Sequence, residues 1–471
     1  MPLVPSVPLL APADLGGVHF IAIGGAGMSG IARLYADLGV PVSGSDQADS
    51  AALRDLRARG VDARVGHDPA QLGQASTVVV SSAVRETNPE LAEARRRGLR
   101  VWHRSAALGA LMLGRTGVAV TGTHGKTTTS AMTAVLLSEA GADPSYVIGS
   151  PLSSTGEAAH AGSGDAFVIE ADESDGSFLQ YPARIVVVTN VEADHLDNWG
   201  TAAAYADGFA ALAAAPGVVA VVAGADDPGS RRLAGQARAA GKQVVTVGEA
   251  ADADVRLQDV RLAGSTASAT LVAEGDSGLL ELAVPGTYNL RNAAAAYAVG
   301  RLLGLPGPAL RAAAAAFNGT HRRFERVAEV AGVTIVDDYA HHPTEVVATL
   351  TAARVFAGEH RVVACFQPHL FTRTRDFADE FGRALALADE VVVLGIYAAR
   401  EDPLPGVTGE LVAAAVRERL ATASVHYVEA VTDAPAALAG IVRDGDLVVT
   451  LGAGDVTAVG PSLARLLEAA G

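Results

Sequence analysis

Short runs of β-branched and other apolar residues alternate along this chain with longer stretches rich in alanine, leucine and arginine. HFIAIG, VAVTG, AFVIE, IVVVTN, VVACF and VVVLG are examples of the apolar runs. Runs of about four to eight residues with this composition are typical of buried strands, and the stretches between them are compatible with helices. The alternation predicts an α/β fold with doubly wound, mainly parallel sheets.

The same pattern divides the chain into three blocks, which we predict to be separate domains covering residues 1–109, 110–321 and 322–471. A chain of 471 residues is too long for one core, since single domains rarely exceed about 250 to 300 residues. Near Asp254 the period changes, and VRLQDVRLAG, ASATLVAEG and LLELAVPG resemble short strands separated by turn residues. We therefore expect a small antiparallel patch on the parallel sheet of the second block.

Composition and charge narrow the class of protein. With 49% hydrophobic residues and 51 glycines, the chain has enough apolar surface for a core and is neither disordered nor fibrous. Its net charge of -16 argues against non-specific binding of nucleic acid or of an anionic membrane. The most apolar long stretch, 202–225, is interrupted by Asp207, Gly208 and Pro216, so we expect no membrane insertion.

Two further features predict a cytoplasmic protein. The single cysteine, Cys365, lies in the apolar run RVVACF, which indicates a small buried hydrophobe rather than a nucleophile. A chain without a disulfide framework suits a reducing compartment. The start, MPLVPSVPLLAPADLGG, has four prolines and no Lys or Arg before Arg33, so it lacks the charged start of a secretory signal and is expected to be irregular.

The most informative segment is VAVTGTHGKTTTS, in which an apolar strand leads into a loop and then a helix. The residues of this predicted phosphate loop are Gly122, Thr123, His124, Gly125, Lys126, Thr127 and Thr128. Glycines let backbone N–H groups approach phosphate oxygens, and a helix N-terminus attracts anions. The lysine can neutralise transferring charge, and the hydroxyl that follows it can coordinate Mg²⁺.

Lysine usage supports this interpretation. The chain has only two lysines, Lys126 and Lys242, and arginine supplies nearly all the other positive charge. The spacing is shorter than in the usual GxxxxGK[ST] motif, because position 120 is valine, so the loop is a variant. The alternative is an ordinary glycine turn with a surface lysine.

Acidic residues follow the next two long predicted strands. The segment IEADESDG offers Glu170, Asp172, Glu173 and Asp175, and the segment TNVEADHLD offers Asn190, Glu192, Asp194, His195 and Asp197. Carboxylates at strand ends beside a phosphate loop are where an α/β sheet presents a metal ion. We prefer Glu173 as a ligand, whereas His195 is either a ligand, a residue behind the ligands or a helix cap. Both clusters could also be solvated loop residues.

Two weaker motifs concern nucleotides. Asn289 and Asn292 stand three apart at the start of a predicted helix, where amides can read an adenine edge or cap the helix. GGAGMSG contains GxGxxG with Gly25 and Gly27 directly after a strand, and Asp46 ends the next strand. This turn would hold the pyrophosphate of a UDP-sugar or of NAD. An NAD-dependent oxidoreductase is therefore a competing hypothesis, although it leaves the second loop unexplained.

The third block carries basic and polar residues that we place at strand ends or in loops, where substrates are met. They lie in HRRFE, DDYAHHPTE and QPHLFTRTRD: Arg322, Arg323, Asp337, Asp338, Tyr339, His341, His342, His369, Arg373 and Arg375. Clustered arginines suit carboxylate and phosphate recognition, because the planar guanidinium can bind two oxygens. Some of these arginines could instead form surface salt bridges, and a zinc site is disfavoured without cysteines or a third close ligand.

With these residues in hand, the chain resembles the Mur ligase family. The resemblance spans nearly the whole chain and rests on an ordered set of motifs: GGAGMSGIA, SGSD, SSAV, GTHGKTTT, EADESDGSF, TNVEADHLD, PGTYNLRNA, HRRFE, DDYAHHPTE, QPHLFTRTRD, IYAARE and GAGD. It implies an N-terminal Rossmann-like domain for a UDP-sugar, a central P-loop ATPase-type domain and a mobile C-terminal Rossmann-like domain that brings the amino acid.

The resemblance also implies roles for individual residues. The UDP-sugar would be held by Gly25, Gly27, Met28, Ser29, Asp46, His67, Ser81, Ser82 and Arg104. ATP would be held by 122–128, by Asn289 and Asn292 at the adenine, and by Arg323 and Asp338 at the ribose and phosphates. Mg²⁺ would be held by Thr127, Glu173 and His195, and the amino acid would face His341, Arg373 and Arg375. The catalytic set implied is Lys126, Glu173, His195, His341 and Arg373.

The implied reaction is ATP-dependent ligation of L-alanine to the carboxylate of UDP-N-acetylmuramate through an acyl phosphate, in peptidoglycan precursor synthesis. Members that add later residues use a carbamoylated lysine near the metal, and the absence of lysine between His195 and Lys242 favours the alanine-adding branch. Tyr288 stands where the family usually has histidine, so adenine stacking is altered while an aromatic face is kept.

Three alternatives stay open at this stage. They are a ligase that recycles a murein tripeptide, an NAD-dependent oxidoreductase and a nucleotide-binding module without enzyme activity. The expected partners are small-molecule substrates, with ATP and Mg²⁺ as cofactors and no nucleic acid. The chain is expected to be a monomer or a homodimer.

Overall fold

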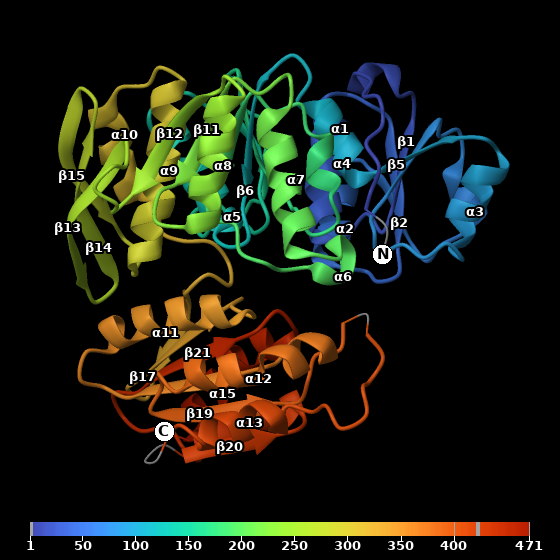
Figure 1. Ribbon diagram of the computed structural model, residues 1–471. Coiled ribbons are helices and arrows are strands. Elements are labelled where there is room, and N and C mark those ends of the chain that lie inside the picture. The colour runs from blue at the N-terminus through green and yellow to red at the C-terminus, as the bar shows by residue number, and fades with distance from the viewer. Residues whose placement is uncertain (1–2, 400, 421–423, 471) are drawn as a thin grey trace. The chain divides into compact units, whose positions relative to one another are not determined.

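The computed structural model describes residues 3–399, 401–420 and 424–470, so Arg400 of the IYAARE segment lies outside the description. The chain divides into two compact units. The first comprises Met1–Gln258, Thr270–Leu280 and Arg291–Phe317, and the second comprises Asp259–Ala269, Glu281–Leu290 and Asn318–Gly471. The three sheets of the described residues are shown in Figure 1.

The first sheet has five parallel strands in the order β3-β2-β1-β4-β5. This is the order expected of a Rossmann-like half with its switch between β1 and β4. Its strands are β1 (Val18–Ile21), β2 (Val42–Asp46), β3 (Asp62–Val65), β4 (Thr77–Val80) and β5 (Arg100–His103). Its helices are α1 (Ala26–Asp37), α2 (Ala51–Ala58), α3 (Pro89–Arg96) and α4 (Arg104–Leu111), with short 3-10 turns at Pro12–Asp14 and Pro69–Leu72.

The central sheet has ten strands in the order β15-β14-β13-β12-β11-β10-β6-β9-β7-β8. Its strands are β6 (Thr116–Thr121), β7 (Ser145–Val147), β8 (Ala159–His160), β9 (Ala166–Glu170), β10 (Ile185–Val188), β11 (Ala220–Gly224), β12 (Gln243–Gly248), β13 (Val255–Ala263), β14 (Thr266–Ala273) and β15 (Asp276–Leu282). Its helices are α5 (Lys126–Glu139), α6 (Leu196–Trp199), α7 (Ala202–Ala214), α8 (Pro228–Ala239), α9 (Thr287–Leu302) and α10 (Gly307–Ala313), with 3-10 turns at Ser177–Gln180 and Ala314–Ala316.

Strand β6 lies between β9 and β10 and is parallel to both. The chain therefore turns to one side of β6 through β7 and β9, and to the other side through β10, β11 and β12. A crevice opens beyond the carboxyl ends of the strands where the strand order reverses, and α/β proteins bind ligands there. The sheet thus directs the end of β6, where the phosphate loop begins, into such a crevice.

Strands β13, β14 and β15 follow one another with connections of only two residues, 264–265 and 274–275. Two residues can join antiparallel neighbours, whereas parallel neighbours need a crossover of a dozen or more. These strands are the antiparallel patch that the sequence predicted beyond Asp254.

The C-terminal sheet has six strands in the order β16-β17-β21-β18-β19-β20, and only the β16–β17 pair is antiparallel. Its strands are β16 (Glu325–Val330), β17 (Val333–Asp338), β18 (Val362–Phe366), β19 (Glu390–Leu394), β20 (Ser424–Val428) and β21 (Leu447–Leu451). Its helices are α11 (Pro343–Ala357), α12 (Phe371–Leu385), α13 (Glu410–Arg417), α14 (Ala434–Ala439) and α15 (Val459–Ala470), with 3-10 turns at Val431–Asp433 and Asp455–Ala458.

The strand period of two divides this C-terminal sheet into two cores. Along β18, Val362, Ala364 and Phe366 pack in the core that includes residues of α11, α12 and α13. Val363 and Cys365 pack on the opposite face, with residues of α14 and α15. Burial raises the pKa of the Cys365 thiol to about 12, so the prediction that this cysteine is a buried hydrophobe is confirmed.

The α/β class, the parallel sheets and the antiparallel patch are as predicted, while the boundaries at 109 and 321 stay predictions. The described part of the N-terminal segment is irregular up to the short turn at Pro12, also as predicted. This segment is nevertheless bonded to the central domain, because Val4 N donates to Asp175 O and Val7 N to Gln180 Oε1. Among the described residues, no helix is long and apolar enough to cross a membrane.

The cores predict where truncation is costly. Phe20 of β1 is fully buried and meets Tyr35 of α1 edge to face, with ring centroids 5.9 Å apart. We expect Phe20→Ala to lower the free energy of unfolding by about 3–5 kcal/mol, because a large side chain leaves a cavity. The control Leu38→Ala, at a side chain that is 56% exposed, should change it by less than about 0.5 kcal/mol. Urea denaturation measures both, and equal losses would contradict the assigned core.

Candidate active site

Two glycines let the phosphate loop take its shape. Gly122 has φ of 132°, and a Cβ there would lie 2.0 Å from Thr189 Oγ1. Gly125, with φ of 82°, is the N-cap residue of α5, and a Cβ there would lie 3.0 Å from Asn292 Oδ1. Both conformations are in the region that only glycine adopts readily, and a side chain at position 122 would also collide with Thr189. The loop therefore keeps its backbone close to β10 and α9.

Lys126, the first residue of α5, folds its side chain back over this loop. Its Nζ donates to Gly122 O at 2.8 Å, to Thr123 O at 3.0 Å and to Glu173 Oε1 at 3.1 Å. Burial would lower the pKa of Lys126, but the negative charges of Glu173 and Asp172 raise it above its usual value. The ammonium group is thus a fixed positive charge at the N-terminus of a helix.

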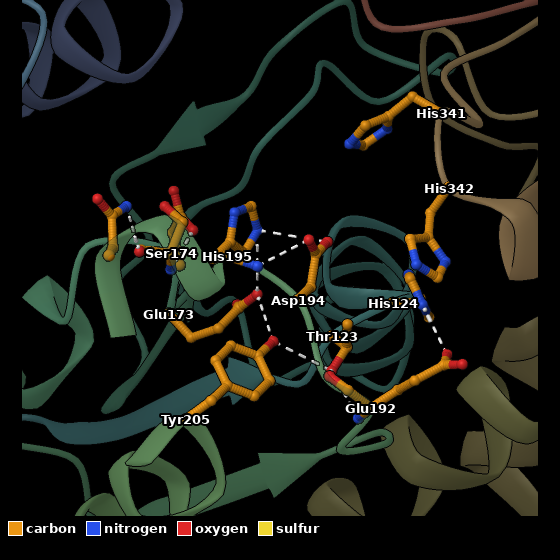
Figure 2. A network of polar contacts seen from close by, with 12 residues as sticks. Thr123, His124, Glu173, Ser174, Glu192, Asp194, His195, Tyr205, His341 and His342 are labelled. Atoms are coloured by element: carbon orange, nitrogen blue, oxygen red, sulfur yellow. Dashed lines mark hydrogen bonds and ion pairs between the residues drawn. The ribbon is translucent and has the colours of Figure 1, made fainter. Parts of the chain in front are cut away.

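Figure 2 shows a network of polar contacts in which Glu173 is linked to both His195 and Tyr205. Glu173 is fully buried, its Oε2 lies 2.9 Å from Lys126 Nζ, and its Oε1 accepts from Tyr205 Oη at 3.1 Å. His195 Nε2 lies 3.8 Å from Glu173 Oε1 and 3.7 Å from Asp194 Oδ2. Burial raises the pKa of Glu173 to about 7, although the charge of Lys126 opposes that shift.

The strand that leads to His195 also braces the loop. Asn190 Oδ1 accepts from His124 N at 2.8 Å, while Thr189 Oγ1 and Asn190 Nδ2 donate to His124 O at 2.6 and 3.0 Å. Thr123 Oγ1 donates to Glu192 O at 2.9 Å, and His124 Nε2 lies 3.1 Å from Glu192 Oε2. The end of β10 therefore holds the loop in place on one side, and Glu173 holds its lysine on the other.

The donor set suits a hard cation. Glu173 Oε2 accepts no hydrogen bond among the residues that the structure describes, and the Lys126 ammonium lies 2.9 Å from it. Thr127, the residue after Lys126 in α5, is buried. His195 ends the loop that follows β10 and has φ of 52°. Carboxylate and hydroxyl oxygens are the ligands that Mg²⁺ prefers, so these residues fit a magnesium ion. The side chain of Asp197 lies outside the described part.

Helix α9 carries the two asparagines on one face, as predicted. Asn289 is buried, and its Nδ2 donates to Pro285 O at 2.7 Å. Its Oδ1 has no hydrogen-bond partner among the described residues, and such an unsatisfied buried acceptor is costly unless a ligand uses it. Asn292 is also buried and lies against Gly125. The unsatisfied Oδ1 of Asn289 fits a base that supplies an N–H donor.

The N-terminal glycine turn faces a second set of charged groups. Gly24 N donates to Asp46 Oδ2 at 2.9 Å, which ties the turn to the end of β2. A Cβ on Gly27 would lie 2.4 Å from an Arg104 guanidinium nitrogen, so any larger residue there would displace the arginine from its present position. Arg104 Nη2 in turn lies 3.6 Å from Asp172 Oδ2, beside Glu173. One acidic loop therefore contacts the lysine of the phosphate loop and the arginine of the glycine turn.

The same acidic loop meets the end of β4. Ser82 Oγ donates to Asp175 Oδ2 at 2.7 Å and lies 3.1 Å from His103 Nε2. Burial lowers the pKa of His103 to about 4, so this ring is neutral near pH 7. The neighbouring Ser81 is half-buried, as is Ser29 of α1. Met28 is 3% exposed and belongs to the hydrophobic core, so its side chain does not face solvent.

In the second unit, Asp338 ends β17 as a buried acceptor. Its Oδ2 accepts from Phe324 N at 2.7 Å and its Oδ1 from Ala340 N at 2.8 Å. Burial raises the pKa of Asp338 to about 6, although the charge of Arg323 opposes that shift. The Arg323 guanidinium stacks 5.0 Å from the ring centre of Tyr339. These contacts fix a carboxyl group and an arginine close to each other.

The residues expected to face the amino acid differ in exposure. His341 Nδ1 lies 3.2 Å from Glu345 Oε2, and its ring meets His369 edge to face at 5.6 Å. Arg373 is buried, whereas Arg375 is exposed and donates to Asp376 Oδ1 at 2.7 Å. The sequence suggested that both arginines lie at a strand end or in a loop. That prediction is wrong, because α12 already begins at Phe371 and both lie in its first turns.

Comparison with known proteins decides the family. Residues 17–116 match the Mur ligase family catalytic domain, residues 120–300 the Mur ligase middle domain, and residues 322–454 the Mur ligase glutamate ligase domain. The UDP-N-acetylmuramate--L-alanine ligase of Cutibacterium acnes is 64% identical over 99% of both chains. This chain belongs to the Mur ligase family.

Two crystal structures resemble this Mur ligase over almost its whole length. UDP-N-acetylmuramate-alanine ligase MurC from Thermotoga maritima superimposes with a TM-score of 0.80 at 27% identity, covering 97% of this chain and 100% of that one. A murein peptide ligase from Psychrobacter arcticus gives a TM-score of 0.71 at 24% identity, covering 96% and 98%. The three-domain α/β fold and the ligase class implied by the sequence motifs are therefore confirmed.

Sequence reasoning missed several residues of this Mur ligase's site. Tyr205 lies in an alanine-rich helix, where nothing in the pattern separates it from core residues, yet it bonds both Thr123 and Glu173. Trp199 supports the same loop, since its Nε1 donates to Glu173 O at 3.0 Å. His103 directly precedes Arg104, which the motifs assigned to the UDP-sugar site, so its position in the sequence could have indicated that it belongs to the same site. The roles assigned from the motifs stay predictions.

The elevated pKa of Glu173 predicts how pH affects stability. A carboxyl whose pKa is 4.5 when unfolded and about 7 when folded binds protons more tightly in the native state. The contribution of this proton binding to the free energy of unfolding is complete below pH 4.5 and is lost as pH rises to about 7. The stability of wild type relative to Glu173→Gln should therefore fall across that window, by no more than about 3 kcal/mol. Urea denaturation at pH 5, 6, 7 and 8 measures it, and a constant difference would contradict the shift.

Proposed function

We propose that this Mur ligase joins the amino group of L-alanine to the carboxylate of UDP-N-acetylmuramate, converting ATP to ADP and phosphate, as a step of peptidoglycan precursor synthesis. The observation that carries the proposal is the ion pair between Lys126 and the buried Glu173 at the phosphate loop, in a chain 64% identical to a UDP-N-acetylmuramate--L-alanine ligase. That pair offers a fixed cation for phosphate oxygens and a carboxylate for a metal ion.

The chemistry explains why a nucleotide is needed. A free carboxylate is a poor acylating agent, so one of its oxygens attacks the γ-phosphorus of ATP. The bond between the γ-phosphorus and the oxygen that bridges to the β-phosphate breaks, ADP leaves with that oxygen, and an acyl phosphate is formed. The alanine nitrogen, after losing a proton from its ammonium form, attacks the acyl carbon. The resulting tetrahedral intermediate expels inorganic phosphate and leaves an amide.

The residues of this chain supply charge and position for these steps. The Lys126 ammonium, held among backbone oxygens at the start of α5, would bind phosphate oxygens and stabilise the charge that develops on them. Thr127, Glu173 and His195 would hold Mg²⁺, which neutralises phosphate charge when bound. Asn289 and Asn292 would bind adenine, and Arg323 and Asp338 the ribose and phosphates.

The remaining assignments concern the two acceptor substrates. The N-terminal turn with Asp46, Ser82 and Arg104 would bind the UDP-sugar, since Arg104 is poised over a glycine where a pyrophosphate can approach. His341, which is bonded to Glu345, would accept the proton of the alanine ammonium. We assign Arg373, which is buried, to the alanine carboxylate more readily than the exposed Arg375.

A ligase that recycles a murein tripeptide is the nearest alternative. The similarity to a murein peptide ligase is 24% in sequence and concerns the fold, whereas the similarity to an alanine-adding ligase is 64%. An oxidoreductase is disfavoured, because the phosphate loop and its acidic partners would have no use. We place the reaction in the cytoplasm, with small-molecule substrates and without nucleic acid, and the chain is a monomer or homodimer.

Phosphate release with UDP-N-acetylmuramate tests the proposal. We expect release to require both ATP and the UDP-sugar and to be fastest with L-alanine among L-alanine, glycine, L-serine and the murein tripeptide. The product should gain the mass of one alanine residue. Faster release with the tripeptide would establish the recycling reaction instead, and nicotinamide turnover without phosphate release would establish an oxidoreductase.

Substitution of the loop lysine gives a second test. We expect Lys126→Ala to lower kcat by about a hundredfold to a thousandfold or more, because a preorganised charge at the phosphates is lost. Affinity for the UDP-sugar, measured by calorimetry, should be unchanged. Lys242→Ala is the matched control, since that lysine donates to the carbonyl oxygens of Ala215 and Val218, away from the phosphate loop, and should affect stability alone. Ordinary turnover by Lys126→Ala would refute the loop assignment.

A further inference from the structure

The N-terminal domain contains a pocket of about 550 Å³ beyond the carboxyl ends of its strands. Its lining includes Asp46 at the end of β2, His67 after β3, and Asn88 and Pro89 at the start of α3. In Rossmann-like sheets this edge receives the nucleoside part of a ligand, with an acidic residue at the end of the second strand. Directly behind this wall lies Glu90, which the motifs did not single out.

Glu90 is fully buried and is surrounded by hydrogen-bond donors. Its Oε2 accepts from Ser45 Oγ at 2.5 Å and its Oε1 from Asp68 N at 3.3 Å. His67 Nδ1 lies 3.3 Å and His19 Nε2 lies 3.6 Å from Oε2. Burial alone would raise the pKa of Glu90, but the contacts with His19 and Ser45 lower it below its usual value. The group is therefore a buried carboxylate that accepts on both oxygens.

The hydrogens of this cluster can be assigned by counting. Ser45 has a single hydroxyl hydrogen, and the short contact to Glu90 uses it, because a carboxylate cannot donate. Ser45 Oγ also lies 2.8 Å from His67 Nδ1. Because its hydrogen is already used, the serine oxygen can only accept in this second contact. The hydrogen of that bond must therefore belong to Nδ1. In the neutral imidazole, Nε2 then carries a lone pair.

That lone pair is available to a ligand. His67 lines the pocket, and both of its contacts with Ser45 and Glu90 are made by Nδ1. Within the described residues, His67 Nε2 has no hydrogen-bond partner. It is also not one of the buried unsatisfied atoms, so solvent or a ligand can reach it. Nε2 can therefore accept a hydrogen bond from a ligand in the pocket, and the contacts of Nδ1 with Ser45 and Glu90 fix the direction of that acceptor.

We propose that Glu90 is a positioning residue that, through Ser45, keeps the proton of His67 on Nδ1, so that Nε2 accepts the imide N3–H of a uracil base. The inference rests on the proposed function, which supplies a uridine nucleotide as substrate. A uracil base in a nucleotide has one N–H group, at N3, so an acceptor of fixed direction selects that edge. Glu90 touches no substrate and acts through the ring.

The first test reads the ring itself in the ligand-free protein. Nitrogen-15 NMR of histidine-labelled wild type at pH 8, assigned by loss of the signals in His67→Gln, should show a protonated Nδ1 and an unprotonated Nε2. In Glu90→Gln only one of the two terminal atoms, the amide oxygen, can accept a hydrogen bond, so the side chain cannot accept from both Asp68 N and Ser45 as the carboxylate does. The His67 proton should then redistribute toward Nε2. A protonated Nε2 in the wild type would overturn the inference.

The second test uses UDP and 3-methyl-UDP, which differ only at N3. Calorimetry on wild type should give about tenfold weaker binding of the methylated nucleotide, as expected for one lost hydrogen bond. Glu90→Gln should bind UDP about tenfold more weakly, with KM for UDP-N-acetylmuramate raised by a similar factor and kcat within twofold. Glu93→Gln, on the same helix and paired with Arg96, is the matched control and should behave as wild type.

The outcomes separate this inference from the function on which it rests. Equal binding of UDP and 3-methyl-UDP by wild type, or wild-type KM in a folded Glu90→Gln, overturns the inference and leaves the ligase activity untouched. Failure of UDP to bind overturns the substrate assignment and the uracil contact together. The NMR measurement reads the tautomer in the wild-type protein itself, and a variant is used only to assign the His67 signals.

Discussion

The site depends on one costly arrangement, a buried carboxylate held against a lysine at the end of a central strand. A fully buried Glu173 is unfavourable as an anion without partners, and Lys126, Tyr205 and His195 surround it. The loop glycines let the lysine turn back toward the sheet, and the strand order opens a crevice in front of it. Each of these features would be destabilising or pointless without the others, which is typical of a functional site.

The acidic loop 172–175 links two halves of the first unit. Its Asp172 approaches Arg104 of the N-terminal domain, Glu173 approaches Lys126, and Asp175 accepts from Ser82. A group bound at the glycine turn and one bound at the phosphate loop would therefore meet charges on the same short segment. This arrangement is suited to bringing a sugar carboxylate toward a nucleoside triphosphate, because one short loop contacts both sites.

Much of the fold and part of the site could be predicted from the sequence. The apolar runs marked the parallel strands, and Gly122, Gly125 and Lys126 marked the strand-to-helix turn, because backbone conformation and helix polarity impose local rules. The contacts that cross the sheet had no such local signal. Tyr205 lies in an alanine-rich helix, and Glu90 at a helix start resembles an ordinary exposed first-turn acid. Only the three-dimensional packing shows that both are buried hydrogen-bonding groups.

The irregular N-terminal segment has a practical consequence for handling the enzyme. Val4 is bonded to the backbone of Asp175, Leu3 packs against Gly176, and Gln180 bonds both backbone groups of Val7. This strap lies across the segment that follows Glu173, only a few residues from the proposed metal ligand. An affinity tag or fusion partner joined ahead of Leu3 would begin next to that segment, so purification handles are better placed at the other terminus, after α15.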